Sequence, residues 1–215
     1  MLAKALLDIV VLLLQGVVHT LYVTLTCFMS AFALGLGVAA LRRLSGRYIA
    51  GLLDLVVFII RPIPVLVLLF LVYFGLPAFD VAVSPLLAMN LSLGVIGGAY
   101  LSEVFRGALA MVEPSETSAA RAAGFSAWQI IRHLEFPQML RFSVPGVMNE
   151  LTAILKNTPF AYMVGIAEIL GQAKALTALS LLGMNIYLIA GLLYFLLYRV
   201  FVLVMDKIEQ RYAVR

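Results

Sequence analysis

The sequence is poor in charged residues and has almost no cysteine. Only 12% of its 215 residues are charged, whereas 64% are hydrophobic, and the mean hydropathy is +1.08. So little polar surface cannot cover a soluble globule, which indicates an integral membrane protein. The single cysteine, Cys27, lies in an apolar run. It excludes a disulfide framework and a thiolate metal site, and we interpret it as a small packing residue.

Signatures of catalysis and of nucleic-acid binding are missing as well. The two histidines, His19 and His133, fall on opposite sides of the membrane in the topology given below, so they cannot share a metal ion. No glycine-rich phosphate loop is present, because Gly94, Gly97 and Gly98 belong to an apolar segment where small residues allow close helix packing. The net charge of +4 comes from basic residues beside apolar segments, not from one basic face. We therefore predict that this chain has no catalytic residue, no metal site, no nucleic-acid partner and no bound cofactor. To use ATP, it would need a separate motor protein.

Apolar segments of membrane-spanning length predict an all-α integral membrane protein that forms a single domain over residues 1–215. Gln15, His19 and Thr20 divide the first long apolar run. We interpret that run as an amphipathic N-terminal helix followed by the first span, with His19 as a polar residue at the membrane interface. The five predicted spans cover about residues 17–41, 49–75, 84–110, 138–159 and 185–205.

Residues 160–183 are long enough to cross the membrane, but they carry Glu168, Gln172 and Lys174. The bias of basic residues decides between five and six spans. With five, only Lys4 and Lys174 lie opposite the ten basic residues that are assigned to the cytoplasmic side. We therefore predict an N-terminus outside the cell membrane, a cytoplasmic C-terminus and a partly re-entrant cap over residues 160–183 on the outer face. The basic residues assigned to the cytoplasmic side are Arg42, Arg43, Arg47, Arg106, Arg121, Arg132, Arg141, Lys207, Arg211 and Arg215.

Two other features stand out in the predicted spans. The second span contains Pro62 and Pro64, which remove backbone donors and break the helix; this is tolerated at membrane depth only where protein or a cavity receives the freed groups. The third span ends with Glu103 and Arg106, spaced for a local ion pair.

Residues 113–137 form the one long stretch that cannot sit in lipid, yet they read as two short helices. An alanine-rich run favours the first helix, and Gly124 ends it. Ser126 and Gln129 have the spacing of a capping box at the start of the second helix, and Pro137 is predicted to end it. The second helix carries a narrow apolar stripe of Trp128, Ile131 and Leu134.

This stretch resembles the EAA loop of the permease subunits of ABC importers. The resemblance rests on Ala119-Ala120 and Gly124, followed after nine residues by Leu134-x-Phe136-Pro137. The family glutamate is replaced by Ser118, and the nearest acid is two positions earlier. In that family the loop forms a coupling helix that docks on a cytoplasmic ATPase, whereas the simpler alternative is an ordinary amphipathic loop. The resemblance assigns the ATPase contact to Ala119, Ala120, Arg121, Gly124, Ser126, Trp128, Arg132 and Pro137.

The resemblance extends over nearly the whole chain and is strongest to the polar amino acid branch, of the histidine, glutamine and arginine type. The segments that carry it are RPIPVLVLLFLVYFGLP, GGAYLSEVFRGAL and NELTAILKNTPFAYMVG. It implies the five-span type I ABC importer permease fold in the bacterial cytoplasmic (inner) membrane. It also implies an identical or paralogous second permease subunit, two cytoplasmic ABC ATPases that bind ATP and Mg, and a periplasmic amino acid-binding protein. The substrate pathway would be lined by the second, third and fourth spans.

A carboxylate in the middle of the fourth predicted span points to the pathway. Glu150 costs about 3 kcal/mol or more there unless it is paired or hydrated. Asn157 lies two turns away on nearly the same face, so both side chains suit the amino group or the cationic side chain of an amino acid. The helix that restarts after Pro64 offers backbone donors to a carboxylate. The candidate pathway residues are Glu150, Asn157, Pro64, Val65, Leu66, Gly97, Gly98 and Arg61.

Other interpretations remain open for these residues. Glu150 could instead form a buried ion pair with Arg61 or Lys156, although Lys156 could also extend to the outer interface. We expect Arg61 to pair with a carboxylate in the bundle rather than to contact substrate, and Asn149 and Asn157 could form interhelical hydrogen bonds.

The function also has alternatives. The family's acid at position 157 is an amide here, its Asn-Ser is Ile96-Gly97 and its second-span glycine is Pro62, so the pocket is less polar than usual. The first interpretation is the membrane subunit of an ATP-driven importer for a polar amino acid or a related compound, with a cationic substrate favoured by Glu150 alone. The second is the non-binding half of a heterodimer. The third is an ion-coupled carrier, which predicts inverted repeats that the two halves of the sequence do not show.

Overall fold

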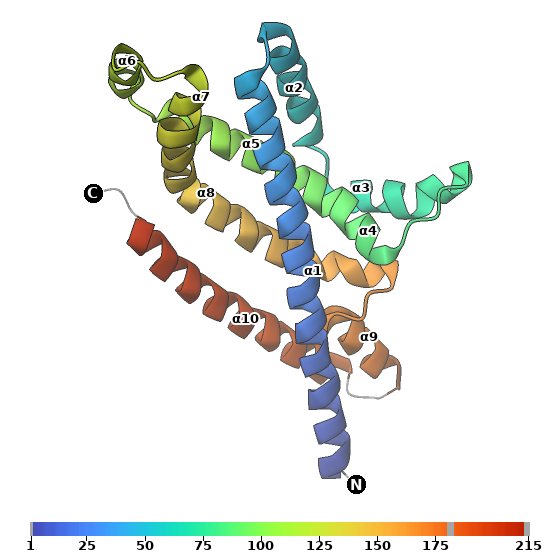
Figure 1. Ribbon diagram of the computed structural model, residues 1–215. Helices are drawn as coiled ribbons and strands as arrows, with labels where there is room; N and C mark the ends of the chain where they lie inside the picture. The colour runs from blue at the N-terminus through green and yellow to red at the C-terminus, as the bar shows by residue number, and fades with distance from the viewer. Residues whose placement is uncertain (1, 180–182, 213–215) are drawn as a thin grey trace.

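The computed structural model describes residues 2–179 and 183–212, and throughout these ranges the secondary structure is helical, with no strand. Figure 1 shows a long N-terminal helix that runs through the whole molecule, with the other helices arranged along it. The all-α prediction is therefore confirmed.

The first helix, α1 (Leu2–Leu44), is continuous over 43 residues. The prediction that Gln15, His19 and Thr20 divide it is wrong. Gln15 and His19 are exposed, and the buried Thr20 satisfies its hydroxyl by donating to the carbonyl oxygen of Gly16 at 3.0 Å. Polar side chains accommodated in these ways do not interrupt a helical backbone.

The second element breaks at its two prolines, as predicted. Helix α2 (Arg47–Ile60) runs back beside the end of α1, and the chain then bends by 96° before α3 (Val65–Phe70) begins. Pro64 adopts an extended conformation directly before α3. The helical backbone continues through a π-helical turn, η1 (Leu71–Gly75), and a 3-10 turn, η2 (Leu76–Phe79).

The next segment supplies the centre of the bundle. Helix α4 (Pro85–Met89), a π-helical turn, η3 (Asn90–Gly94), and α5 (Val95–Ala110) follow one another without a break and pack along α1. Leu101 and Phe105 of α5 and Cys27 of α1 are fully buried in this core, so the packing role predicted for Cys27 is confirmed.

The segment after α5 leads into the fourth long helix. It comprises α6 (Pro114–Ala122), α7 (Ala127–Ile130), a π-helical turn, η4 (Ile131–Glu135), and α8 (Phe136–Asn157). The prediction that Pro137 ends the second helix is wrong, because the helical backbone continues from α7 through η4 into α8. Pro137 lies in the first turn of α8, next to the wide π turn, where its missing N–H is tolerated.

The chain ends with a short cap and a last long helix. A 3-10 segment, η5 (Thr158–Val164), leads to α9 (Ile169–Leu179), which packs against α1 at the opposite end from α6 and α7, and α10 (Gly183–Tyr212) completes the fold. The cap predicted over residues 160–183 corresponds to these two elements, except that residues 180–182 lie outside the described ranges.

Within the described ranges, three helices are long and apolar enough to cross a membrane: Ile9–Leu44, Pro85–Ala110 and Gly183–Ile208. The bent pair Arg47–Ile60 and Val65–Phe79 makes a fourth candidate if it counts as one span. Helix α8 has the length but carries Arg141, Glu150 and Lys156. The predicted count of five spans therefore remains a prediction.

Candidate functional site

The break between α2 and α3 is occupied by Arg61, whose expected carboxylate partner is not found among the described residues. The guanidinium carbon lies 4.9 Å from the centre of the Tyr100 ring, and the Tyr100 hydroxyl donates to the Arg61 carbonyl oxygen at 3.1 Å. The buried Arg61 Nε has no hydrogen-bond partner in the described part of the chain. A cation–π contact thus replaces the predicted ion pair and leaves a guanidinium donor free.

Glu150 lies against α5 with no ion pair to any described residue. A Cβ atom added to Gly97 would come within 3.2 Å of Glu150 Oε1, so the structure brings these two predicted pathway residues together. Lys156, the other candidate partner, places its Nζ 4.6 Å from the centre of the Tyr198 ring. The predicted pairing of Glu150 with Arg61 or Lys156 is therefore wrong for this chain alone.

Asn157 and Gly98 are placed less favourably for contact with a ligand. The amide of Asn157 donates to the Ala153 carbonyl oxygen of its own helix at 2.9 Å. A Cβ atom on Gly98 would lie 2.8 Å from Leu34 Cβ, so Gly98 serves the close approach of α5 to α1. The exposed Asn149 forms no interhelical hydrogen bond among the described residues.

A charged cluster joins α1, α2 and α5 beside this region. Arg42, whose side chain is only 8% exposed, contacts Asp54 at 3.0 Å and donates to Glu103 at 2.8 Å. Arg106 donates to the same Glu103 at 2.7 Å, which confirms the predicted local pair. A cavity of about 330 Å³ opens next to the cluster, lined by Asp54, Val57, Phe58, Arg61, Glu103 and Arg106. It offers both signs of charge to a zwitterion.

Residues 113–137 fold as the sequence indicates at their two helix ends. Gly124 has a positive φ of 86° and accepts the left-handed turn that ends α6. The Phe125 N–H donates to the Ala120 carbonyl and the Gly124 N–H donates to the Arg121 carbonyl, which is the Schellman pattern. Ser126 and Gln129 form the predicted capping box of α7.

The surface of this segment is available for docking. Ala119, Arg121, Gly124 and Ser126 are exposed, and Ala120 is half-buried. The residue at the position of the family glutamate, Ser118, is also exposed, and its hydroxyl donates to the Pro114 carbonyl oxygen at 2.8 Å.

The nearest acid to that position, Glu116, is used inside the segment. It accepts a hydrogen bond from Gln138 at the start of α8. Glu116 therefore ties α6 to α8 instead of extending freely from the loop.

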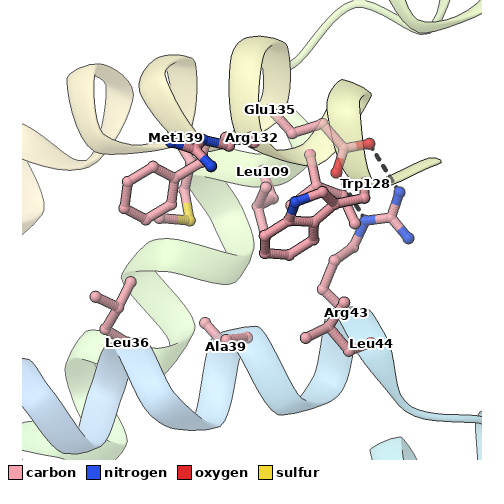
Figure 2. Close-up of a pocket in the computed structure, with 12 residues that line it drawn as sticks. Leu36, Ala39, Arg43, Leu44, Leu109, Trp128, Arg132, Glu135 and Met139 are labelled. Carbon is pink, nitrogen blue, oxygen red and sulfur yellow. Dashed lines mark hydrogen bonds and ion pairs between the residues drawn. The ribbon is translucent and has the colours of Figure 1, made fainter. Parts of the chain in front are cut away.

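The remaining predicted coupling residues lie on α7, η4 and the first turn of α8, the part of the segment that faces α1. Figure 2 shows Trp128 and Arg132 at a cavity whose floor is α1. Arg43 of α1 donates two hydrogen bonds to Glu135, each at 2.8 Å, so a bidentate pair connects the end of α1 to the second of the two short helices.

The cap is tied to α10 by a buried carboxylate. Glu168 accepts from the backbone N–H groups of Leu170 at 3.1 Å and Gly171 at 2.8 Å, and from the Tyr194 hydroxyl. Burial raises the pKa of the Glu168 carboxyl, while the hydrogen bonds from Tyr194 and the two backbone groups act in the opposite direction.

From the sequence, Arg42 and Arg43 were predicted only to mark a membrane boundary, and no role was predicted for Asp54 and Glu135. The structure shows that they form the links between helices near the site. Paired arginines at the end of a span and single acids in otherwise apolar or amphipathic helices were the available signals, but the partners are far apart in the sequence.

Comparison with known proteins defines the class to which this helical membrane protein belongs. Residues 31–214 match the family described as binding-protein-dependent transport system inner membrane component. The chain is 30% identical over 217 residues to the histidine/lysine/arginine/ornithine transport system permease protein HisQ of Escherichia coli, covering 94% of this chain and 93% of HisQ. It is 29% identical over 203 residues to the glutamine transport system permease protein GlnP of the same organism, covering 93% of this chain and 92% of GlnP.

A solved structure resembles the chain over almost its whole length. A crystal structure of an amino acid ABC transporter with histidines has a TM-score of 0.88 and 25% identity, and the match covers 97% of each chain. The fold is therefore that of the type I permeases. The chain belongs to the family of binding-protein-dependent transport system inner membrane components.

Proposed function

We propose that this chain is the membrane-spanning subunit of an ATP-driven importer of polar amino acids, and that residues 113–137 are its coupling loop. The observation that carries the proposal is the pair of short helices at one end of the bundle, which presents an exposed, capped surface outside the long apolar helices. The names of the relatives support this substrate class: one serves histidine, lysine, arginine and ornithine, and the other serves glutamine.

The proposed assembly has several parts. Two permease subunits, identical or paralogous, each with five spans, carry two cytoplasmic ABC ATPases that bind ATP and Mg, while this chain binds no cofactor. A periplasmic amino acid-binding protein delivers the substrate. The N-terminus and residues 160–183 face the periplasm, whereas the loop over residues 113–137 and the C-terminus face the cytoplasm. The closing of the ATPases would draw the two coupling loops together and rock the spans, and hydrolysis would reset them.

The proposed pathway runs past Glu150, Gly97 and the break at Arg61 and Pro64. Glu150 has no ion pair among the described residues, so its carboxylate can receive an ammonium or a guanidinium group. The free Nε of Arg61 and the first N–H groups of α3, those of Val65 and Leu66, can receive a carboxylate. The cavity lined by Asp54, Arg61 and Glu103 extends from this point between α2 and α5.

A second candidate function is the non-binding half of a heterodimer. It is favoured by Asn157, whose amide hydrogen bonds within its own helix, and by Gly98, which packs against α1. In that case Glu150 would only pack the bundle, and the partner subunit would hold the amino acid.

Replacing Gly124 by leucine tests the proposed coupling. A leucine at φ of 86° costs about 1–2 kcal/mol and distorts the turn between α6 and α7, although nothing lies within 4 Å of the added Cβ. Reconstituted complexes should hydrolyse ATP but lose most of the uptake per ATP, with normal membrane insertion. The control is Gly51→Leu, which adds the same side chain to an open face of α2. Full ATP-driven uptake by the Gly124→Leu complex would contradict the proposal.

A further inference from the structure

One face of α8 is polar along almost the whole length of the helix. Six residues on this face follow one another three or four positions apart, so they lie within about 80° of each other around the helix axis. They form a stripe about 27 Å long, close to the roughly 30 Å thickness of a bilayer core. This α8 stripe consists of Gln138, Arg141, Pro145, Asn149, Thr152 and Lys156. Pro145 is its single apolar member.

The α8 stripe is also the part of α8 that this chain leaves uncovered. Beyond the first turn of the helix, the exposed residues are Arg141, Pro145, Asn149 and Lys156, and all four belong to the stripe. The other faces of α8 are buried or half-buried, and the helix packs against α5, α10 and α1. The surface that α8 presents to its surroundings is therefore polar.

The neighbouring helix α10 exposes the opposite kind of surface. Leu188, Leu192 and Phe195 are exposed along it, which suits contact with lipid. Arg199 is exposed in the second half of this helix, where its long side chain can extend toward the membrane boundary. Charged side chains spread along a whole helix cannot all extend in this way, so lipid does not explain the α8 stripe.

The charges of the α8 stripe are all positive, and no described residue neutralises them. Arg141 and Lys156 form no ion pair within the described part of the chain. The Nζ of Lys156 lies 4.6 Å from the centre of the Tyr198 ring of α10, a contact that orients the ammonium without cancelling its charge. Asn149 lies between the two cations and adds amide donors. Cations at membrane depth are stable where water hydrates them or a negative group pairs with them.

We propose that the α8 stripe lines a water-filled space and that its unpaired cations attract the carboxylate of the transported amino acid. The identity of the solute rests on the proposed function, and the carboxylate is the group that amino acids share whatever their side chain. Glu150 is not part of the stripe, because it lies at least about 100° away around the helix axis, against Gly97. Two faces of one helix would thus receive the two charged groups of the solute.

Cysteine labelling tests whether water reaches the stripe. Asn149→Cys and Leu192→Cys are each made in a Cys27→Ala background and examined in membrane fragments from cells that produce the complete complex, with both membrane faces open to the reagent. Both positions are exposed on this chain, one on the stripe and one on α10. A charged methanethiosulfonate reagent should modify Asn149→Cys about tenfold faster or more, because charged groups are excluded from the bilayer core. Equally slow modification at the two positions would mean that lipid or dry protein covers the stripe, and would overturn the proposal.

The same chemistry measures the charge of the stripe. Thr152→Cys lies one turn from Lys156, and its rates with an anionic and a cationic methanethiosulfonate reagent give a ratio. Lys156→Gln should lower the anionic-to-cationic ratio about fivefold, since the two reagents differ by two unit charges. Lys156→Arg should keep the ratio, and so should the control Arg199→Gln, at an exposed cation outside the stripe. A ratio that Lys156→Gln leaves unchanged would overturn the proposal.

The labelling needs neither ATP nor amino acid. The expected labelling in a complex that fails to transport amino acids would count against the proposed function alone. Amino acid uptake by a complex whose stripe is not labelled would count against the α8 stripe alone.

Discussion

Glu150 is the residue whose environment demands a functional explanation. It lies in the middle of α8 against Gly97, while the two cations expected to neutralise it, Arg61 and Lys156, stack on tyrosine rings. A carboxylate at this depth costs about 3 kcal/mol or more unless water or a cation accompanies it. A hydrated pathway and a passing amino acid would both meet that need.

Glu150→Gln keeps the shape of the side chain and removes its charge. If Glu150 binds the ammonium or the cationic side chain of the substrate, the concentration for half-maximal stimulation of ATPase activity should rise about tenfold, equivalent to ~1.4 kcal/mol. The control is Asp206→Asn, the same change at an exposed position on α10. An unchanged half-maximal concentration in Glu150→Gln would favour the non-binding half of a heterodimer.

Interactions between residues close in sequence could be predicted, whereas those between distant residues could not. Gly124 and the Glu103–Arg106 pair follow from spacing alone, because neighbouring turns of one helix determine the geometry. Arg43 and Glu135 are 92 positions apart, and only the tertiary fold brings them together. Arg61 was predicted to pair with a carboxylate, but it forms a cation–π contact with Tyr100 on the neighbouring helix instead.

The ion pair between Arg43 of α1 and Glu135 of η4 connects the proposed coupling loop to the rest of the bundle. Each of Arg43→Gln and Glu135→Gln should lower the solute transported per ATP by several-fold, since each removes one charge of the pair and breaks its bidentate geometry. The double variant should transport no less solute per ATP than either single variant, because the effects of mutations at two residues of one pair are not additive. Arg47→Gln, at an exposed arginine, is the control. Additive losses in the double variant would show that the two side chains act separately.

The cap depends on a close approach between two helices. A Cβ atom on Gly16 of α1 would lie 2.8 Å from Ile169 Cα and 2.9 Å from its nitrogen, and backbone atoms cannot move aside as a side chain can. Gly16→Ala should therefore lower the free energy of unfolding of the purified chain by about 1–3 kcal/mol, measured by thermal or denaturant melting in detergent. Gly37→Ala, where nothing lies within 4 Å of the new Cβ, is the matched control and should be neutral or slightly stabilising. Equal stability of the two variants would contradict the packing of α9 on α1.

Helix types were more predictable than helix ends. The break at Pro62 and Pro64 was expected and is present, because two nearby prolines leave the backbone no alternative. The expected end at Pro137 was wrong, since a π turn lets one proline sit in the first turn of the next helix. The polar residues near position 19 were wrongly taken as a division of α1, because a helix accepts them wherever their side chains are solvated or bonded locally.

The whole chain exposes surfaces that are typical of one subunit of a larger membrane complex. Large apolar side chains are exposed along α2 and α10, among them Phe58 and Phe195, so these surfaces need lipid or a second permease subunit. The exposed surface of α6 and α7 lies at the end of the bundle opposite α9, which suits two different partners on the two sides of a membrane. In the proposed mechanism a force applied to α7 would reach α1 through Arg43 and Glu135, and it would reach α8 directly because the helical backbone is continuous from α7 to α8.

The most direct test of the coupling loop is to find which protein it touches and on which side of the membrane. Cys27 is the single cysteine and is buried, so a reporter can be added at an exposed position as Ala119→Cys in a Cys27→Ala background. Phe79→Cys, on the loop predicted to face the periplasm, is the control. We predict that the cysteine at position 119 cross-links to the ATPase subunit and is shielded, in intact cells, from an impermeant thiol reagent that labels position 79. Labelling of position 119 from outside the cell, with no cross-link to the ATPase, would contradict the account.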